Sequence, residues 1–152
     1  MFEPAQELAQ VKVGLTTATK LANAHFVEAD FYLPIDNLSK NAILEANFDL
    51  LLVSGASPTK TLSIQQVCDT YGCTVAFFDN ISDEYDPIWN VMTNLKAKLD
   101  SREMPNNLDV ADVRQLAVTS EMLLAFNSHN ELFSYLQRSA IGSVVGCIYL
   151  AH

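Results

Sequence analysis

The chain has 152 residues, with nine Lys and Arg against 18 Asp and Glu, so its formal net charge is −9. Hydrophobic residues make up 49% and charged residues 18%, which excludes a chain that is disordered throughout, because disorder combines low hydrophobicity with high charge. The scarcity of basic residues argues against direct nucleic-acid binding, since phosphates are neutralised by clustered Lys and Arg. We expect a single globular domain over residues 1–152, because this length suits one hydrophobic core.

The cysteines and the apolar stretches indicate the cellular compartment of the protein. We expect three reduced and mostly buried thiols, Cys68, Cys73 and Cys147, with the first two close together across the Tyr71-Gly72 turn. The first four residues do not resemble a signal peptide, and the longest uncharged apolar stretch, residues 139–151, is too short to span a bilayer. The sequence therefore predicts a cytoplasmic protein outside the membrane.

The first predicted element is a helix over residues 4–25, because apolar side chains recur there at intervals of three and four. Residues 11–15 also alternate with period two, so a short strand beginning there is the alternative. Residues 26–33 alternate between apolar and acidic side chains, which predicts a half-buried strand ended by Pro34.

Two helices and two more strands are predicted next. Asp36, Asn37 or Ser39 can cap a short helix that carries residues 38–46. Residues 48–53 form a nearly continuous apolar run, typical of a strand that is buried on both faces. A second helix follows the break at residues 55–58 and ends just before Gly72. Residues 73–78 are again β-branched or aromatic and predict a third strand.

These elements form a βαβαβ series over about 26–80. The crossovers of about 15 and 18 residues are long enough to connect parallel strands. Because such crossovers are right-handed, both helices are expected on one face of a three-stranded parallel sheet. The predicted fold class is α/β, a small and mainly parallel sheet with a helix-rich C-terminal half.

The helical portion is predicted over about 83–138. One helix carries a stripe that we expect to pack in the core rather than in a coiled coil, formed by Tyr85, Ile88, Met92, Leu95 and Leu99. Further helices are predicted over about 110–124 and about 132–136. The tail, residues 141–150, favours a strand over a buried last helix, and Gly142 and Gly146 indicate close packing there.

The loop at residues 54–61 follows a buried strand and opens a helix, which is the setting of a phosphate-binding loop. It has Ser54 and Thr59 where that motif needs glycine, and Pro58 removes an N–H donor. An ordinary capped turn is therefore the favoured interpretation. The weaker alternative is an anion site at the helix N-terminus, formed by Ser54, Ser57, Thr59 and Lys60.

Carboxylates gather where the carboxyl ends of the strands are expected. Asp36, Asp79 and Asp83 would supply Mg²⁺ ligands if they converged at that edge. The favoured interpretation is that Asp83, Glu84 and Asp86 stabilise the N-terminus of the following helix. No spacing of His and Cys matches a zinc site, and no nucleophile motif occurs, so we expect neither a metal nor catalytic residues.

The location of the charge is the most informative feature. Between residues 41 and 95 Lys60 is the only basic residue against seven acids, so this segment carries −6 of the total −9. Such a surface attracts a basic partner, and aromatic side chains, which are enriched in interface cores, interleave with the acids. The predicted partner-binding residues are Phe77, Asp79, Asp83, Glu84, Tyr85, Asp86 and Trp89.

The sequence thus favours a non-catalytic interaction protein, such as an adaptor, assembly factor, chaperone-like subunit or inhibitor. Its partner would be another protein, with basic character, and the sequence leaves homo-oligomer formation open. The alternative is a Mg²⁺-dependent phosphotransfer enzyme or phosphate-ligand domain, with Asp36, Asp79 and Asp83 on the metal and Ser54 and Lys60 on the anion.

Overall fold

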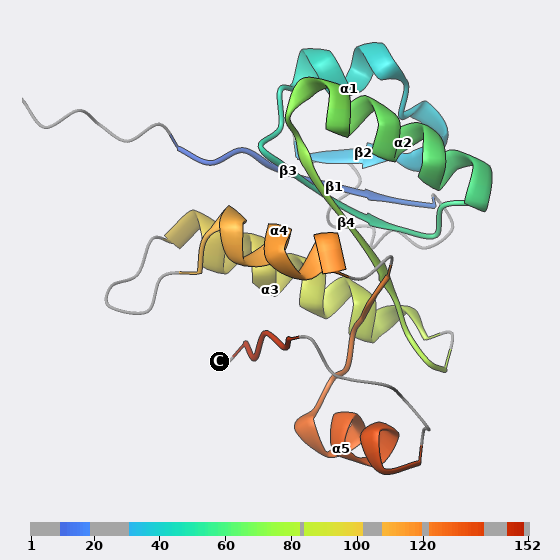
Figure 1. Ribbon diagram of the computed structural model, residues 1–152, viewed down its shortest axis with the longest axis vertical. Helices are drawn as coiled ribbons and strands as arrows, with labels where there is room; N and C mark the ends of the chain where they lie inside the picture. The colour runs from blue at the N-terminus through green and yellow to red at the C-terminus, as the bar shows by residue number, and fades with distance from the viewer. Residues whose placement is uncertain are drawn as a thin grey trace, which may run out of the picture.

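The computed structural model describes residues 10–18, 31–82, 84–101, 108–119, 122–138 and 146–150. Within these residues the chain forms one five-stranded, wholly parallel sheet in the order β2-β1-β3-β4-β5. Figure 1 shows helices on both sides of this sheet. The predicted α/β class is confirmed. The strands are β1 (Val13–Thr17), β2 (Tyr32–Pro34), β3 (Leu50–Ser54), β4 (Thr74–Asp79) and β5 (Leu123–Leu124).

The predicted βαβαβ series corresponds to β2, α1 (Lys40–Ala46), β3, α2 (Pro58–Tyr71) and β4. Both helices cover the same face of the sheet, as expected from right-handed crossovers. They pack over a core that includes Ile43 of α1, Ile64 and Cys68 of α2, and strand residues of the same face. The strand residues are Leu51, Val53, Val75 and Phe77.

The helix predicted over residues 4–25 is wrong at its centre, where residues 13–17 form β1, and the alternative of a short strand beginning within residues 11–15 is confirmed. This strand lies between β2 and β3, so all five of its residues are buried. A glycine is needed at its second position, because a Cβ on Gly14 would lie 2.5 Å from Cε2 of Phe48. The rest of the predicted helix, residues 4–9 and 19–25, lies outside the described residues.

The ends of the two helices follow their sequence signals. The Ser39 hydroxyl accepts a hydrogen bond from the Ala42 N–H at 3.0 Å and caps α1. Ser57 caps α2 in the same way, with Pro58 in the first helical position. Gly72 ends α2 in the left-handed region at φ 74°, as the sequence predicts.

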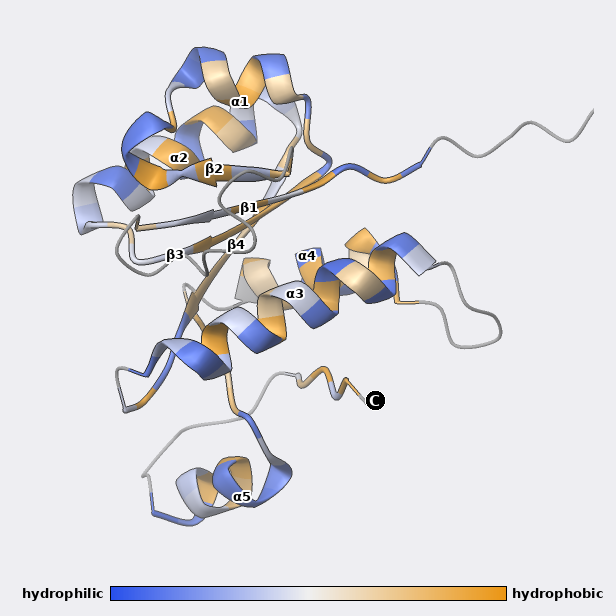
Figure 2. Cartoon of the chain, turned by 180° about the vertical axis from the view of Figure 1, so that it is seen from behind, coloured by the Kyte–Doolittle hydropathy of each residue, from blue (hydrophilic) through white to orange (hydrophobic). Residues whose placement is uncertain are grey.

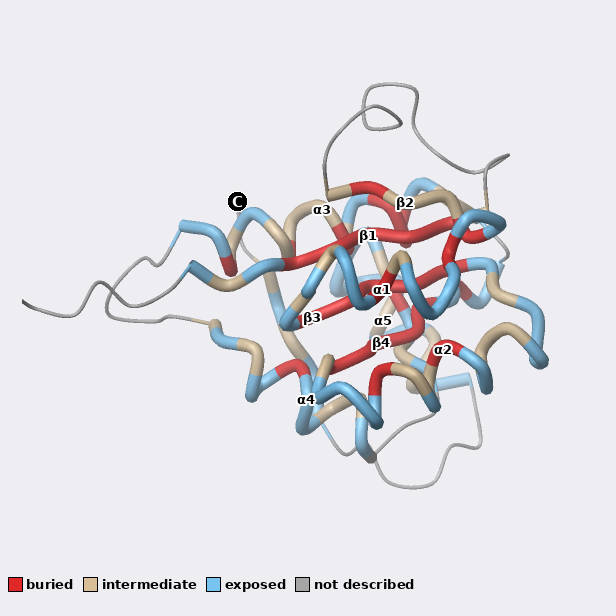
Figure 3. Tube along the Cα trace, turned by 90° about the horizontal axis from the view of Figure 1, so that it is seen from above, coloured by how far each residue is buried: buried red, intermediate tan, exposed pale blue. Residues whose placement is uncertain are grey.

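The opposite face of the sheet is covered by α3 (Tyr85–Ser101) and α4 (Val110–Thr119). The predicted stripe packs in the core, where Met92 is fully buried, except that Tyr85 is only half-buried. Figure 3 shows the buried strands running between exposed outer helix faces. Residues buried on this face include Leu15, Leu50, Leu52, Ala76, Phe78, Ile88, Trp89, Met92, Leu95, Leu99 and Val113.

The helix predicted over 110–124 ends earlier than expected, since α4 stops at Thr119 and residues 123–124 form β5. Leu123 pairs with Phe78 and Leu124 with Asp79, so β4 holds this short edge strand in place. The last helix is α5 (His129–Arg138), which lies apart from the sheet (Figure 1). It carries hydrophobic as well as hydrophilic residues (Figure 2), and none of its residues is buried.

The described part of the tail, residues 146–150, has neither helix nor strand, so the strand favoured for it is not formed there. Ile148 and Leu150 still pack against the core beneath α3 and α4. The close packing expected at Gly146 is present, because a Cβ there would overlap the side chain of Leu116. Gly142 lies outside the described residues. None of the described helices combines the length and the apolar character that a membrane crossing requires.

Candidate functional site

The carboxyl ends of the strands form one edge of the sheet, where a ligand site is expected. The strand order reverses direction between β1 and β3, because β2 lies on one side of β1 and all later strands lie on the other. Open α/β sheets bind ligands outside the carboxyl ends of the strands at such a switch point. The strand register aligns one row of residues across this edge. The row consists of Pro34, Thr17, Ser54, Phe78 and Leu123.

The polar side chains next to this switch point, between β1 and β3, make contacts that stabilise the fold. The Thr17 hydroxyl lies 3.0 Å from the Tyr32 hydroxyl, and this hydrogen bond is buried. The Tyr32 ring meets Trp89 edge-on, with 6.2 Å between the ring centroids. These contacts fix the end of β1 against β2 and α3.

The loop between β3 and α2 forms the ordinary capped turn that the sequence favoured. The Ser57 hydroxyl accepts from the Lys60 N–H at 3.2 Å, and Thr59 is exposed. The Lys60 ammonium donates to the Leu38 carbonyl at 2.6 Å, so its charge is directed toward the backbone before α1. Ser54 is buried at the end of β3. An anion site on these residues stays a prediction, and the structure gives Lys60 another partner.

A crevice separates this loop from the end of β4. Its volume is about 110 Å³. Ligand pockets are usually roughly 300–1,000 Å³, so this crevice is too small for a nucleotide. Its lining is Val53, Ser54, Gly55, Ala56, Thr61, Phe77, Phe78, Asp79, Tyr85 and Met122.

The structure does not bring the candidate Mg²⁺ ligands together. Asp36 lies in a 3₁₀ turn (Ile35–Asn37) after β2, and Asp79 ends β4. Because β1 and β3 lie between them, strand spacing alone puts them about 14 Å apart. Asp83 lies outside the described residues, and among the residues that are described no three acids, His or Cys form a metal-binding group.

Asn80, which is not among the predicted site residues, organises the loop between β4 and α3. Its side-chain oxygen accepts from the Ser82 N–H at 2.8 Å and, more weakly, from the Glu84 N–H at 3.4 Å. Its side-chain NH₂ donates to the Ala125 carbonyl at 2.9 Å. One buried amide thus ties the start of α3 to the end of β5. The available signal was an Asp-Asn pair that follows a strand, a typical turn sequence.

The predicted partner surface is only partly exposed. Asp79, Glu84 and Asp86 are exposed, and Tyr85 is half-buried. Phe77 and Trp89 are each 7% exposed and belong to the cores on opposite faces of the sheet. These two residues are therefore corrected from surface to core, because the strand and the helix that carry them are covered by neighbouring elements.

Three exposed apolar side chains, none of them among the predicted partner-binding residues, lie beside the acids. Ile81, Met122 and Leu124 are 49%, 41% and 40% exposed. Leu124 stands directly opposite Asp79 in the parallel pairing of β5 with β4. We call this surface the acidic edge, defined by Asp79, Ile81, Glu84, Asp86, Met122 and Leu124.

Comparison with known proteins gives no relative for this chain. No family model, no curated protein and no solved structure matches it. The chemistry of the residues themselves is thus what supports a function.

Proposed function

We propose that this chain is a non-catalytic interaction protein that binds a protein partner through the acidic edge. The observation that carries the proposal is the mixture of exposed groups around the ends of β4 and β5. Three carboxylates and three apolar side chains share this small area. Interfaces combine apolar contact with complementary charge, and this surface offers both.

The chemistry of the acidic edge indicates the kind of partner. Its exposed acids belong to the segment over 41–95, which carries −6 of the net charge, so a basic partner is attracted. Within the described residues no strand pairs with the outer side of β5. Open strand edges accept extended peptides by backbone pairing. We therefore infer a partner segment that is extended, with basic and apolar side chains in alternation.

The alternative, Mg²⁺-dependent phosphotransfer, has weaker geometric support. Asp36 and Asp79 are separated by two strands, and Lys60 donates to Leu38 rather than facing an open pocket. The crevice beside Asp79 holds about 110 Å³. Each of these observations favours the interaction function over a nucleotide site.

The experiment uses two fluorescent peptides, one alternating Lys with Val and the other alternating Glu with Val. We expect fluorescence anisotropy to show binding of the Lys peptide, with an affinity that falls as salt rises. The double change Glu84→Lys and Asp86→Lys is expected to weaken binding by about tenfold or more. Met122→Ala with Leu124→Ala should weaken it at every salt concentration, because apolar contacts are not screened.

The control makes the same change in net charge elsewhere, with Asp36→Lys and Glu45→Lys. Both positions are exposed and lie away from the acidic edge. We expect the control to bind nearly as well as the unchanged protein. An equal loss in both double variants would mean that net charge alone attracts the peptide, which contradicts a site at the acidic edge. Equal binding of the Glu peptide would contradict it as well.

A further inference from the structure

Two cysteines meet at the end of α2, on the side of the sheet away from the acidic edge. After Gly72 turns the chain into the left-handed region, the Cys73 N–H donates to the Cys68 carbonyl at 3.0 Å. This hydrogen bond, which closes six residues, is the mark of a Schellman motif, and a side-chain contact between the two residues so joined frequently accompanies it. The backbone therefore fixes Cys68 and Cys73 as neighbours.

The two thiols interact and differ in environment. Cys68 is fully buried, whereas Cys73 is partly exposed at the start of β4. The Cys73 thiol donates to the Thr74 carbonyl at 3.4 Å. Its interaction with the Cys68 thiol raises the pKa of Cys68, which burial raises further, and lowers the pKa of Cys73. Burial and the charge of Asp49 oppose this lowering without reversing it. Cys73 is therefore the thiol that ionises more readily, and Cys68 holds its proton.

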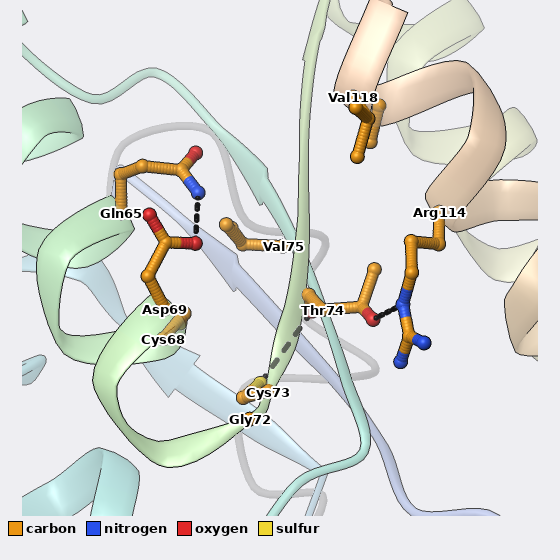
Figure 4. A pocket seen from close by; sticks show the side chains of 10 residues that line it. Gln65, Cys68, Asp69, Gly72, Cys73, Thr74, Val75, Arg114 and Val118 are labelled. Carbon is orange, nitrogen blue, oxygen red and sulfur yellow. Dashed lines mark hydrogen bonds between the residues drawn. The ribbon is translucent and has the colours of Figure 1, made fainter.

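A groove gives solvent access to this pair (Figure 4). It lies between the end of α2, the start of β4 and α4, and its volume is about 680 Å³. Arg114 spans it from α4 and donates from Nε to the Thr74 hydroxyl at 2.9 Å. Cys68 and Cys73 both contribute to its lining, and Cys73 is the partly exposed member of the pair.

We propose that Cys68 and Cys73 are a redox-active dithiol that hydroperoxides oxidise to a disulfide. The Cys73 thiolate attacks one peroxide oxygen, so an S–O bond forms, the O–O bond breaks and hydroxide leaves. Cys68 then gives up its proton, its sulfur bonds to the Cys73 sulfur, and the second oxygen leaves as water. Overall the two thiols lose two electrons and two protons, and hydrogen peroxide becomes two waters.

The fold favours closure within this pair over other outcomes. A disulfide joins residues whose Cα atoms lie about 4.4–6.8 Å apart, and a direct backbone hydrogen bond already holds these two side by side. The third cysteine, Cys147, is exposed and belongs to the tail segment, so it provides a measure of how an ordinary surface thiol reacts. The inference does not depend on the proposed function.

The experiment uses the full chain with all three cysteines. The protein is treated with hydrogen peroxide, its free thiols are alkylated under denaturing conditions, and it is cleaved with chymotrypsin. Because Tyr71 lies between the two cysteines, cleavage there leaves Cys68 and Cys73 on separate fragments. We expect the fragments to stay linked until a reductant is added, with a linked mass about 2 Da below the sum of the two reduced fragments.

Two single variants test the assigned order of steps. In Cys68→Ser, peroxide is expected to leave Cys73 as a sulfenic acid that a dimedone probe labels. In Cys73→Ser, dimedone should not label Cys68, because its thiol keeps its proton in the core. The result that overturns the proposal is read on the unchanged protein. If peroxide oxidises Cys147 but leaves Cys68 and Cys73 as free thiols, which are then alkylated and found unlinked, the pair is not redox-active.

Discussion

The side-chain NH₂ of Asn80 donates to the Ala125 carbonyl at 2.9 Å, across 45 residues of sequence. The two residues belong to the connections that follow β4 and β5, which are the neighbouring strands at one end of the sheet. The Ala125 N–H in turn donates to the Asp79 carbonyl at 2.9 Å. The two-residue strand β5 is thus held in place by the buried Asn80 side chain as well as by its pairing with β4.

Replacing Asn80 tests this support. In Asn80→Ala the Ala125 carbonyl and the Ser82 N–H lose their partner, so we expect the free energy of unfolding to fall by about 1–3 kcal/mol. Urea denaturation measures the change. The control is Asn41→Ala on the exposed side of α1, which should change stability by no more than about 0.5 kcal/mol. Equal effects of the two substitutions would contradict the role given to Asn80.

Lys60 allows the capped turn to be distinguished from an anion site. Lys60→Met removes the bond to the Leu38 carbonyl and should lower the free energy of unfolding by about 0.5–1.5 kcal/mol. We also expect inorganic phosphate to shift the melting temperature of Lys60→Met and of the unchanged protein equally. A phosphate-induced rise that disappears in Lys60→Met would instead support the anion site.

Gly14 and Phe48 test the packing of β1. In Gly14→Ala the new Cβ would lie 2.5 Å from the Phe48 ring, so the core must shift. We expect a loss of about 1–3 kcal/mol in the free energy of unfolding. Phe48→Leu removes the obstructing ring, and in the double variant the cost of Gly14→Ala should become smaller. Additive losses in this double-mutant cycle would show that the ring is not the cause.

The Mg²⁺ alternative makes a separate prediction. Because Asp36 and Asp79 lie about 14 Å apart by strand spacing, we expect millimolar Mg²⁺ with nucleotide to leave the melting temperature unchanged. Thermal unfolding of the unchanged protein and of Asp79→Asn measures this. A rise that Asp79→Asn abolishes would support the enzyme hypothesis, since a ligand bound only to the folded state stabilises it.

The lowered pKa of Cys73 predicts the pH dependence of its alkylation. Iodoacetamide reacts with the thiolate, so the rate falls as pH decreases through the pKa. Because the Cys68 thiol stabilises the Cys73 thiolate, the midpoint should lie below the usual value for a cysteine thiol. Cys68→Ala removes the donor, and the Cys73 midpoint is then expected to rise. A Cys73 midpoint that is unchanged in this variant would contradict the stabilisation of the Cys73 thiolate by Cys68.

Local signals predicted the elements whose structure is decided locally. The elements β3, α2 and β4 were recognised from their apolar patterns and from turn residues at their ends, such as Gly72, whose conformation few other residues tolerate. β1 was misassigned because apolar side chains at intervals of three and four over residues 4–25 outweigh the short period-two alternation at residues 11–15, which is the local signal of the strand. β5 was missed because two residues become a strand only through pairing with β4.

The residues of the candidate site were likewise predictable where local chemistry decides their exposure, and unpredictable where the covering elements decide it. The exposure of Asp79, Glu84 and Asp86 follows from their charge alone, and the structure agrees. Phe77 and Trp89 were misplaced because aromatic side chains suit both interfaces and cores, and only the covering helices decide between them. Met122 and Leu124 join the acids through a pairing that spans more than 40 residues, which no local pattern encodes.

The position of β1 affects how the protein folds during synthesis. This strand is the earliest in the described chain, yet it lies inside the sheet and pairs with β2 and β3, which both follow it. In a nascent chain one side of β1 therefore stays unpaired until β3, which ends at Ser54, has left the ribosome. The centre of the sheet closes only then, so a translation pause shortly before β3 would prolong the stage in which β1 offers an open strand edge.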